Sequence, residues 1–302
     1  MLLVFGSVNA DLLFKVDALP RPGETVLCAG YELAAGGKGA NQAAAAAKAG
    51  AQVRMVGHVG DDGFGRFARA TLETAGVDCS GVRSSQRATA IAVIGVDGRG
   101  ENQIIVASGA NLDSHAGQIE HGELSSEVTL LCQNEIAPEA TFAAIVRGRA
   151  RGARTILNLA PAAPLPAAVL EGLDILAVNE IEAAAALGAS GEPADLAREL
   201  ARRHGLTCVV TLGAQGAIAL GPSEAWRIGA LAIETVDTTG AGDAFVGVLA
   251  AALDRGQILA DALRRASVAA ALACTKVGAQ TSQPTLAEIE SHLGRLPHAE
   301  RF

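Results

Sequence analysis

Aromatic residues are scarce in this sequence, at 3% of its 302 residues, and basic residues are fewer than acidic ones. Hydrophobic residues still make up 50% of the chain, so a large core can form, but aliphatic side chains must build it. The net charge of −8 disfavours nonspecific binding to nucleic acid or to an anionic membrane. Any phosphate that the protein binds must therefore be stabilised by groups within its own binding site.

Paired cysteines are also lacking. The five cysteines form no C-x-x-C pair and their number is odd, which disfavours a zinc site and a disulfide framework and favours reduced thiols in a cytoplasmic protein. The first residues are apolar but carry no basic segment, and Asp11 follows early, so they predict a strand and not a signal peptide. No uninterrupted apolar span of about twenty residues predicts a membrane helix.

Two common glycine-rich nucleotide loops are absent. A mononucleotide-binding loop needs G-x-x-x-x-G-K-[ST], but Lys38 is followed by Gly39, and Glu32 stands where the first glycine belongs. A dinucleotide-binding loop needs G-x-G-x-x-G after the first strand, and the chain reads GSVNAD there. Neither mode of nucleotide binding is therefore predicted.

Apolar strand-like segments alternate with helix-like segments over most of the chain. This order predicts an α/β fold with three layers, in which a mostly parallel central sheet is covered by helices on both faces. The helices are expected at 64–75, 139–150, 180–187, 193–204, 241–254 and 259–275. Extra early strands, with 24–33 among them, and a hairpin over 89–107 do not fit this alternation. We expect one domain, 1–302, with a small β-sheet lid formed by approximately 12–35 and 89–107.

The segment DTTGAGDAF (Asp237–Phe245) places two glycines and a carboxylate at the start of a helix. The first N–H groups of a helix lack internal partners and carry positive partial charge, so Gly240, Ala241 and Gly242 can form an anion hole for phosphate oxygens. A carboxylate repels a phosphate bound beside it, so its presence there calls for a function. Accepting the proton of an attacking alcohol is such a function for Asp243. The alternative is an ordinary capped helix, with Thr238 or Thr239 as the N-cap.

A second glycine-rich segment, GGKGANQAAAAAKAG (Gly36–Gly50), also precedes a helix. With DTTGAGDAF it resembles the two signature regions of the ribokinase-like (pfkB) carbohydrate kinases. GSVNAD, NEIEA and TLGAQG follow predicted strands in the order that this family shows. The resemblance covers essentially the whole chain. It implies the ribokinase-like fold and an ATP-dependent sugar kinase, most similar to members that phosphorylate the O5 hydroxyl of D-ribose to ribose 5-phosphate.

The resemblance also implies which residues bind sugar. A carboxylate suits a diol because it accepts two hydrogen bonds. Taken alone, Asn-Ala-Asp could be only a turn, and Lys38 could be a solvated loop cation. The expected substrate-binding residues are Asn9, Asp11, Gly37, Lys38, Asn41, Glu135 and Asp243, with Asp243 as the catalytic base.

On the nucleotide side, the family match places two loops and a late helix around ATP. Glu182 is expected to organise Mg²⁺ through water, although Glu180 and Glu182 could equally be ordinary acids of a helix first turn. Position 267 is serine where some family members place a histidine beside adenine, which puts the adenine packing in doubt. The expected ATP-binding residues are Asn179, Glu182, Thr211, Gly213, Gly216, Gly242 and Ser267.

The family carries a monovalent cation site beside its anion hole. The resemblance implies that K⁺ activates this protein too, and several of the ligands would be backbone carbonyls. The matching positions are Asp237, Thr239, Ala273, Lys276, Gly278 and Ser282.

Other functions stay open on the sequence. A kinase of deoxyribose, of another small sugar or of a nucleoside is the first alternative; a nucleoside usually needs an aromatic wall, and few aromatics precede residue 32. A noncatalytic sugar sensor would be expected to lose Asp243 or a glycine, and a hydrolase using Asp11 and Asp17 would leave DTTGAGD without a role. The hairpin carries Ile91, Val93, Ile104 and Val106, predicting either a homodimer through two lids or a cover over the substrate within one chain.

Overall fold

Strand β1 (Leu2–Phe5) is buried on both faces, and all four of its side chains are fully shielded from solvent. Successive side chains of a strand point to opposite faces. Accordingly, Leu2 and Val4 belong to one hydrophobic cluster and Leu3 and Phe5 to another. A strand with two apolar faces fits the centre of a parallel sheet covered on both sides.

A computed structural model describes residues 1–120 and 122–302 and contains two sheets. The large sheet has the strand order β14-β13-β12-β11-β10-β9-β8-β1-β4-β5. Its strands from β11 to β5 are parallel, and β12, β13 and β14 add antiparallel pairings at one edge. Besides β1, its strands are β4 (Val53–Gly60), β5 (Asp78–Ser85), β8 (Thr129–Gln133), β9 (Arg154–Asn158), β10 (Ile175–Asn179), β11 (Thr207–Thr211), β12 (Ala217–Leu220), β13 (Ala225–Ile228) and β14 (Glu300–Arg301).

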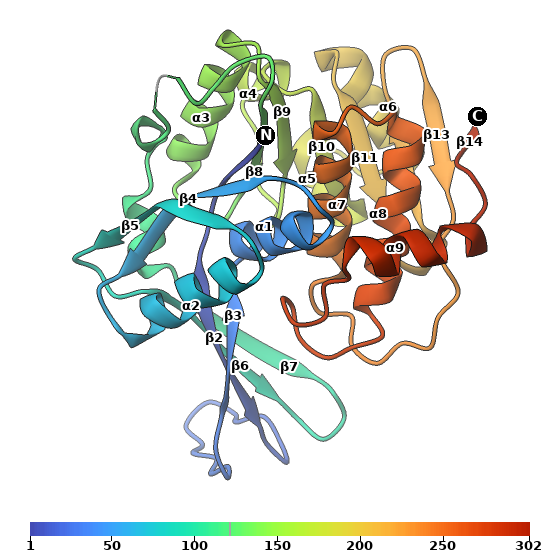
Figure 1. Cartoon of the computed structure of the whole chain (residues 1–302). Coiled ribbons are helices and arrows are strands. Elements are labelled where there is room, and N and C mark those ends of the chain that lie inside the picture. Colours follow the sequence, from blue (N-terminus) through green and yellow to red (C-terminus); the bar gives the residue numbers. More distant parts are fainter. Residues whose placement is uncertain (121) are drawn as a thin grey trace.

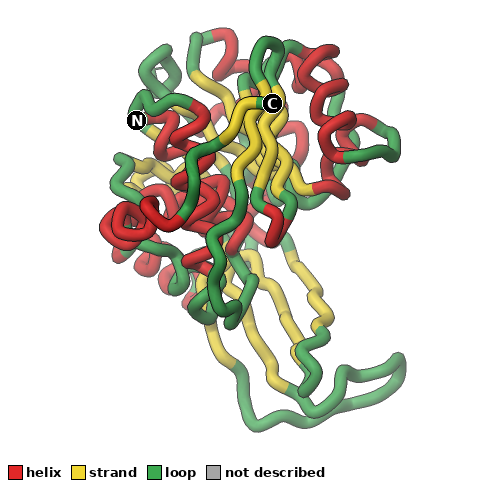
Figure 2. The backbone as a smooth tube through the Cα atoms, turned by 90° about the vertical axis from the view of Figure 1, so that its right-hand side faces the viewer, coloured by secondary structure: helices red, strands yellow, loops and turns green. Residues whose placement is uncertain are grey.

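Helices cover both faces of the large sheet (Figures 1 and 2). One cluster joins α1, α2, α7, α8 and α9 to one face, and the other joins α3, α4, α5 and α6 to the opposite face. The predicted three-layer α/β fold is therefore confirmed. The helices are α1 (Lys38–Lys48), α2 (Gly63–Thr74), α3 (Pro138–Ala150), α4 (Ala167–Glu171), α5 (Glu180–Leu187), α6 (Pro193–His204), α7 (Ala241–Asp254), α8 (Leu259–Ala273) and α9 (Leu286–His292). Within the described residues, no helix has the length and apolar character needed to cross a membrane.

The small sheet has the order β3-β2-β6-β7 and extends away from the helices and the large sheet (Figure 2). It consists of β2 (Asn9–Lys15), β3 (Glu32–Gly36), β6 (Ala90–Val96) and β7 (Asn102–Ala107), and β6 and β7 form the expected hairpin. The strand predicted over 24–33 is wrong, because the strand found there, β3, begins only at Glu32. The chain before it is exposed and pairs with no strand of the described residues, so its partial alternation has no sheet to join.

The pairing register corrects the apolar face predicted for the hairpin. Val93 pairs with Ile105, whereas Ala92 pairs with Val106. Since paired residues share a face, Ile91 and Val93 lie on the opposite face from Ile104 and Val106. The four residues therefore do not form one continuous surface. Asp11 pairs with Ala92, which places Val106 on the same face as the Asp11 carboxylate.

Candidate active site

Polar residues gather where neighbouring parallel strands end. Gln133 at the end of β8 is the register partner of Asn158 at the end of β9. Asn179 at the end of β10 is likewise the partner of Thr211 on β11. Open α/β sheets bind ligands at this edge, outside the carboxyl ends of the strands. The predicted site residues from distant parts of the sequence meet here.

Asp243 lies in the first turn of α7 and is only 7% exposed. Its Oδ1 accepts a hydrogen bond from Gln42 Nε2 at 2.9 Å, and its Oδ2 accepts one from Asn41 Nδ2 at 2.9 Å. Burial raises the pKa of Asp243, while Lys38 and these two amides favour its ionised form. A buried carboxylate with few donors and a raised pKa is suited to accept a proton.

The glycine turn before α7 differs from an ordinary capped helix. The N-cap is Gly240, with φ of 76° and no side-chain cap, so neither Thr238 nor Thr239 caps the helix. A Cβ on Gly240 would lie 2.8 Å from the Cα of Ala279, which leaves no room for a side chain. Ala241 N donates to Thr238 O at 3.2 Å, so one of the three expected anion-hole residues has its amide engaged. The amides of Gly242 and Asp243 have no acceptor among the described residues.

Asn9 and Asp11 lie two residues apart on β2 and so share a face of the small sheet. Asn111 Nδ2 donates to Asn9 Oδ1 at 2.8 Å, which leaves the amide N–H groups of Asn9 for another partner. Asp11 Oδ1 is buried and has no hydrogen-bond partner among the described residues. Burial raises the pKa of Asp11 to about 6, and the nearby Glu135 and Asp243 carboxylates contribute. The strand thus offers a donor and an acceptor side by side.

The glycine loop is fixed to the strand ends by Glu135 and Ser7. Glu135 Oε2 accepts hydrogen bonds from Ser7 Oγ at 2.8 Å and from the Lys38 backbone N at 2.9 Å. Ser7 Oγ in turn accepts from Gly39 N at 3.2 Å. Gly37 has a φ of 86° and turns the chain into α1. The Oε2 atom of Glu135 therefore holds the loop, and the other carboxylate oxygen, Oε1, takes no part in these contacts.

A narrow hollow of about 170 Å³ lies beside Asp243. Lys38, Asn179 and Glu182 also line it, together with Thr211, Gly240 and Gly242. Asn179 and Glu182 form a capping box: Glu182 N donates to Asn179 Oδ1, and Asn179 N donates to Glu182 Oε2, each at 2.8 Å. Glu182 therefore caps α5 and also borders the hollow, whereas Glu180 is exposed.

A second, apolar hollow of about 460 Å³ adjoins the narrow one and shares Thr211 and Gly242 with it. Leu231, Ile233 and Phe245 contribute its apolar lining, and Gly213, Gly216 and Ser267, which were predicted to bind ATP, border it. Ser267 Oγ donates to Gly229 O at 2.6 Å, so its hydroxyl is already engaged. A planar heterocycle fits such a hollow, with a polar tail reaching toward Asp243.

The predicted cation positions gather only in part. Asp237 accepts hydrogen bonds from the amides of Thr239 and Gly278, each at 2.9 Å, and these lower its pKa although burial opposes them. Ser282 is fully buried, and its Oγ has no partner among the described residues. A buried hydroxyl without a partner and an ionised carboxylate are both oxygen ligands of the kind that a hard cation takes.

The other two predicted cation ligands, Ala273 and Lys276, can contribute only backbone carbonyls. The carbonyl of Ala273 accepts from Lys276 N at 3.3 Å. The Lys276 ammonium lies 2.8 Å from Glu288, in an exposed ion pair. Lys276 could therefore serve a cation only through its carbonyl oxygen.

Several buried amides at the site were not identified from the sequence. They are Gln42, Asn111, Gln133, Asn158 and Gln280, and each is less than 9% exposed. Gln280 Nε2 donates to Asn41 Oδ1 at 3.0 Å across 239 residues of sequence. Gln42 does stand inside the quoted motif GGKGANQA, and that position was the available signal.

Comparison with known proteins agrees with this geometry. The family model described as "pfkB family carbohydrate kinase" matches residues 1–286. The chain belongs to this family of carbohydrate kinases. It is 35% identical to a ribokinase of Haemophilus influenzae over 95% of this chain and 96% of that one. The family resemblance inferred from the motifs is thereby confirmed.

Solved structures of pfkB-type carbohydrate kinases have the same fold. A ribokinase of Thermotoga maritima matches with a TM-score of 0.91 at 32% identity, covering 97% of this chain and 99% of that one. A ribokinase of Arabidopsis thaliana, solved with ribose and ATP, matches with a TM-score of 0.88 at 30% identity, covering 97% and 98%. The predicted ribokinase-like fold and the assignment as a kinase are confirmed.

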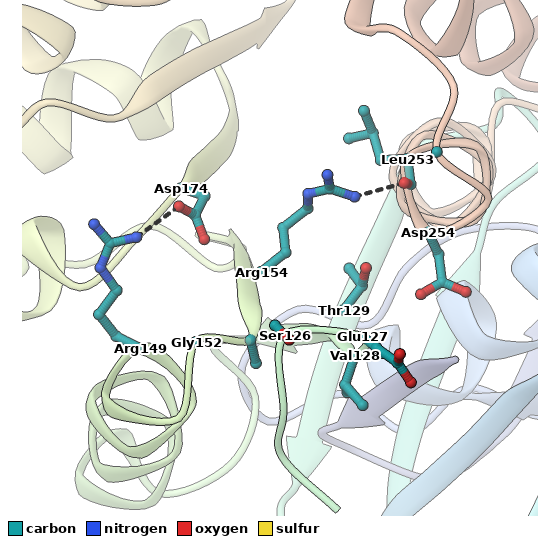
Figure 3. Close-up of a pocket in the computed structure, with 12 residues that line it drawn as sticks. Ser126, Glu127, Val128, Thr129, Arg149, Gly152, Arg154, Asp174, Leu253 and Asp254 are labelled. Atoms are coloured by element: carbon teal, nitrogen blue, oxygen red, sulfur yellow. Dashed lines mark hydrogen bonds and ion pairs between the residues drawn. The ribbon is translucent and has the colours of Figure 1, made fainter.

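Another hollow of this carbohydrate kinase, of about 390 Å³, lies at the opposite edge of the sheet (Figure 3). It is bordered by the amino ends of β8 and β9 and by the end of α7. Both of its arginines are already engaged, because Arg149 lies 2.8 Å from Asp174 and Arg154 Nη1 donates to Leu253 O at 2.5 Å. We therefore assign the chemistry to the edge that carries Asp243.

Proposed function

We propose that this kinase transfers the γ-phosphoryl group of ATP to the O5 hydroxyl of D-ribose, giving ribose 5-phosphate and ADP. The observation that carries the proposal is the position of Asp243. Its carboxylate borders the narrow hollow beside the glycine turn and contacts Asn41 in the first turn of α1. The ribokinase relatives, one of them solved with ribose and ATP, support the choice of substrates.

In this mechanism the sugar lies against β2 and the glycine loop. Asn9 donates to one sugar hydroxyl and Asp11 accepts from another, as their free groups allow. Gly37, Lys38, Asn41 and Glu135 surround the sugar on the loop side. The small sheet, approximately 12–35 and 89–107, covers it as a lid, and residues 1–302 act as one unit.

The transfer itself uses Asp243 and the helix start. Asp243 accepts the O5 proton as O5 bonds to the γ-phosphorus and the bond from that phosphorus to the oxygen of ADP breaks. The amides of Gly242 and Asp243 stabilise the transferring group, and Lys38 neutralises part of its charge. Ala241 joins them if its bond to Thr238 opens. Asn179, Glu182 and Thr211 border the phosphates, and Gly213, Gly216 and Ser267 border the adenine.

Two metal ions belong to the proposal. Glu182 and Asn179 would hold Mg²⁺ through water, and the ion would neutralise phosphate charge. Asp237, Thr239, Gly278 and Ser282, with the Ala273 and Lys276 carbonyls, would hold K⁺ beside the glycine turn. Gln283 Nε2 donates to Gly240 O at 3.3 Å, so the segment that contains Ser282 contacts the turn directly.

We also propose a homodimer through the small sheets. Strand β7 is exposed along its whole length, and Ile105 is 73% exposed. Apolar side chains on an edge strand invite pairing with another chain. Light scattering of Ile105→Asp tests this proposal, since a charge there should shift the mass toward the monomer. An exposed apolar control on α3, Val146→Asp, should leave the mass unchanged.

The decisive experiment measures ADP release with ATP, Mg²⁺ and a panel of pentoses, 2-deoxyribose and nucleosides. The highest kcat/KM is expected for D-ribose, with phosphate on O5. Asp243→Asn should lower kcat by about 10²–10⁴-fold while both substrates still bind in calorimetry. Turnover of that variant at the wild-type rate would refute the role of Asp243, and a preference for 2-deoxyribose would refute the choice of sugar.

A further inference from the structure

We propose that Gln42 is a positioning residue that holds Oδ1 of Asp243 and so commits Oδ2 to receiving the sugar proton. The inference rests on the proposed role of Asp243 as the base. Gln42 belongs to the buried part of α1 and does not border the narrow hollow.

The amide of Gln42 uses all of its hydrogen-bonding groups on three buried partners. Its Nε2 donates to Asp243 Oδ1 at 2.9 Å and to Asn158 Oδ1 at 2.8 Å. Its Oε1 accepts from Gln133 Nε2 at 2.7 Å. The side chain is 0% exposed, so water does not replace any of these bonds. The four residues come from α1, β8, β9 and α7 and form one connected network.

The network allows only one orientation of the Gln42 amide. Asn158 Nδ2 donates to Ala177 O at 3.1 Å, which turns Asn158 Oδ1 toward Gln42 as an acceptor. A reversed Gln42 amide would set its oxygen against two acceptors, Asn158 Oδ1 and the Asp243 carboxylate. Buried polar groups left unpaired in this way are costly, so the donor remains on Asp243.

Backbone packing fixes the distance between Gln42 and Asp243. Gly247 lies one turn after Asp243 on α7, and a Cβ there would approach the Gln42 carbonyl oxygen to 2.5 Å. The two helices therefore meet at a contact that admits no side chain. Protein interiors are closely packed, so α1 and α7 cannot easily shift relative to each other at this contact. The Gln42 amide therefore has little freedom to move away from Asp243 Oδ1.

The contact on the other oxygen is of a different kind. Asn41 donates to Oδ2, and apart from this bond its side chain is held only by Gln280 among the described side chains. Asn41 is 6% exposed, whereas Gln42 is 0% exposed. An entering sugar hydroxyl can take the place of Asn41 at Oδ2, but it cannot reach the enclosed Gln42 contact. The two adjacent amides thus divide the carboxylate into a held oxygen and a reactive one.

The test compares Gln42→Met with Gln118→Met, which removes another buried glutamine that donates to a backbone carbonyl. For Gln42→Met we expect kcat to fall about 10- to 100-fold, as for the loss of a hydrogen bond to a charged group. Both KM values should stay nearly unchanged. The acidic limb of the kcat–pH profile should move to higher pH, because the Gln42 bond lowers the pKa of Asp243. Gln118→Met should leave kcat and the limb unchanged.

A double variant separates positioning from stability. Gln42→Met with Gln133→Met replaces both partners of one bond by apolar groups, so it should recover thermal stability while kcat stays low. If Gln42→Met does not fold, Gln133→Met alone should lower kcat in the same direction, by a smaller factor. The inference is overturned if the folded Gln42→Met and Gln133→Met variants keep the wild-type kcat and the wild-type acidic limb while Asp243→Asn is inactive. An active Asp243→Asn overturns the proposed function as well.

Discussion

Asn41 Nδ2 lies 2.9 Å from Asp243 Oδ2, so a residue in the first turn of α1 holds the oxygen that the sugar hydroxyl is proposed to approach. The two residues are 202 positions apart in the sequence. This contact would link sugar binding to the readiness of the base, because the donor that holds Oδ2 follows directly after the glycine loop that is proposed to receive the sugar. Asn41 is therefore expected to affect the base directly, in addition to its predicted contact with the sugar.

Asn41→Asp should lower kcat and move the acidic limb of the pH–rate profile upward. Two carboxylates about 3 Å apart cannot both ionise easily, so one proton is retained and the base is blocked until higher pH. The profile of kcat against pH measures the shift. Asn102→Asp, on exposed β7, serves as the control. A profile for Asn41→Asp that overlays the wild type would show that Asn41 does not contact the base in solution.

The pH dependence of ribose binding should reflect Asp11. The pKa of Asp11 is raised to about 6 by burial, so protonation near that pH removes the acceptor that the proposed diol contact needs. We expect the KM for ribose to rise as the pH falls through this value. Isothermal titration of ribose across the same range checks the binding step. Constant affinity there would exclude Asp11 as an ionised sugar ligand.

The same raised pKa predicts a gain in stability for Asp11→Asn. The folded-state pKa of about 6 exceeds the ordinary aspartate pKa of 3.8, so the folded protein binds the proton more tightly than the unfolded chain. Ionised Asp11 therefore destabilises the fold above this pH, and the penalty disappears as the pH falls through the window. Asp11→Asn should melt a few degrees higher at neutral pH, with a smaller difference in mild acid. Asp17→Asn, on an exposed loop, should show neither effect.

Gly240→Ala should destabilise the protein and reduce turnover together. The alanine Cβ would meet the Ala279 backbone at 2.8 Å, and the φ of 76° adds strain of about 1–2 kcal/mol. Differential scanning calorimetry and kcat report the two effects. The matched control is Gly242→Ala, where a Cβ meets no atom within 4 Å, so its melting temperature should stay at the wild-type value. Equal melting temperatures for both variants would contradict the role of the turn.

Ser282→Ala should weaken activation by K⁺ without weakening the fold in its absence. The buried Ser282 hydroxyl has no partner among the described residues, so its removal deletes an unsatisfied polar group. Activity titrated with KCl, at ionic strength held constant with choline chloride, gives the half-activating concentration, which should rise. Melting in choline chloride alone should be unchanged or higher. An unaltered KCl titration would remove Ser282 from the cation site.

The order of elements along the chain was sufficient to predict most of the fold. Helices α5, α6 and α7 begin and end where the apolar periodicity and flanking residues placed them. The short elements α4, α9 and β14 and the edge strand β5 were missed, because few residues carry each signal and their neighbours decide them. The false strand at 24–33 shows the same limit, since alternation makes a strand only where another strand can pair with it.

By itself, the sequence determined the α/β class, the kinase family and the residues that carry charge at the site. These depend on local order: a motif, its spacing and the period of the apolar residues. Only the tertiary structure decided which face of the small sheet each hairpin residue occupies, that Gly240 and not a threonine begins α7, and which amides hold Asp243. Gln42 and Gln133 lie 91 positions apart and meet through strand register and helix packing. Such contacts depend on which buried polar groups hydrogen-bond to each other, and a local sequence pattern does not indicate these pairs.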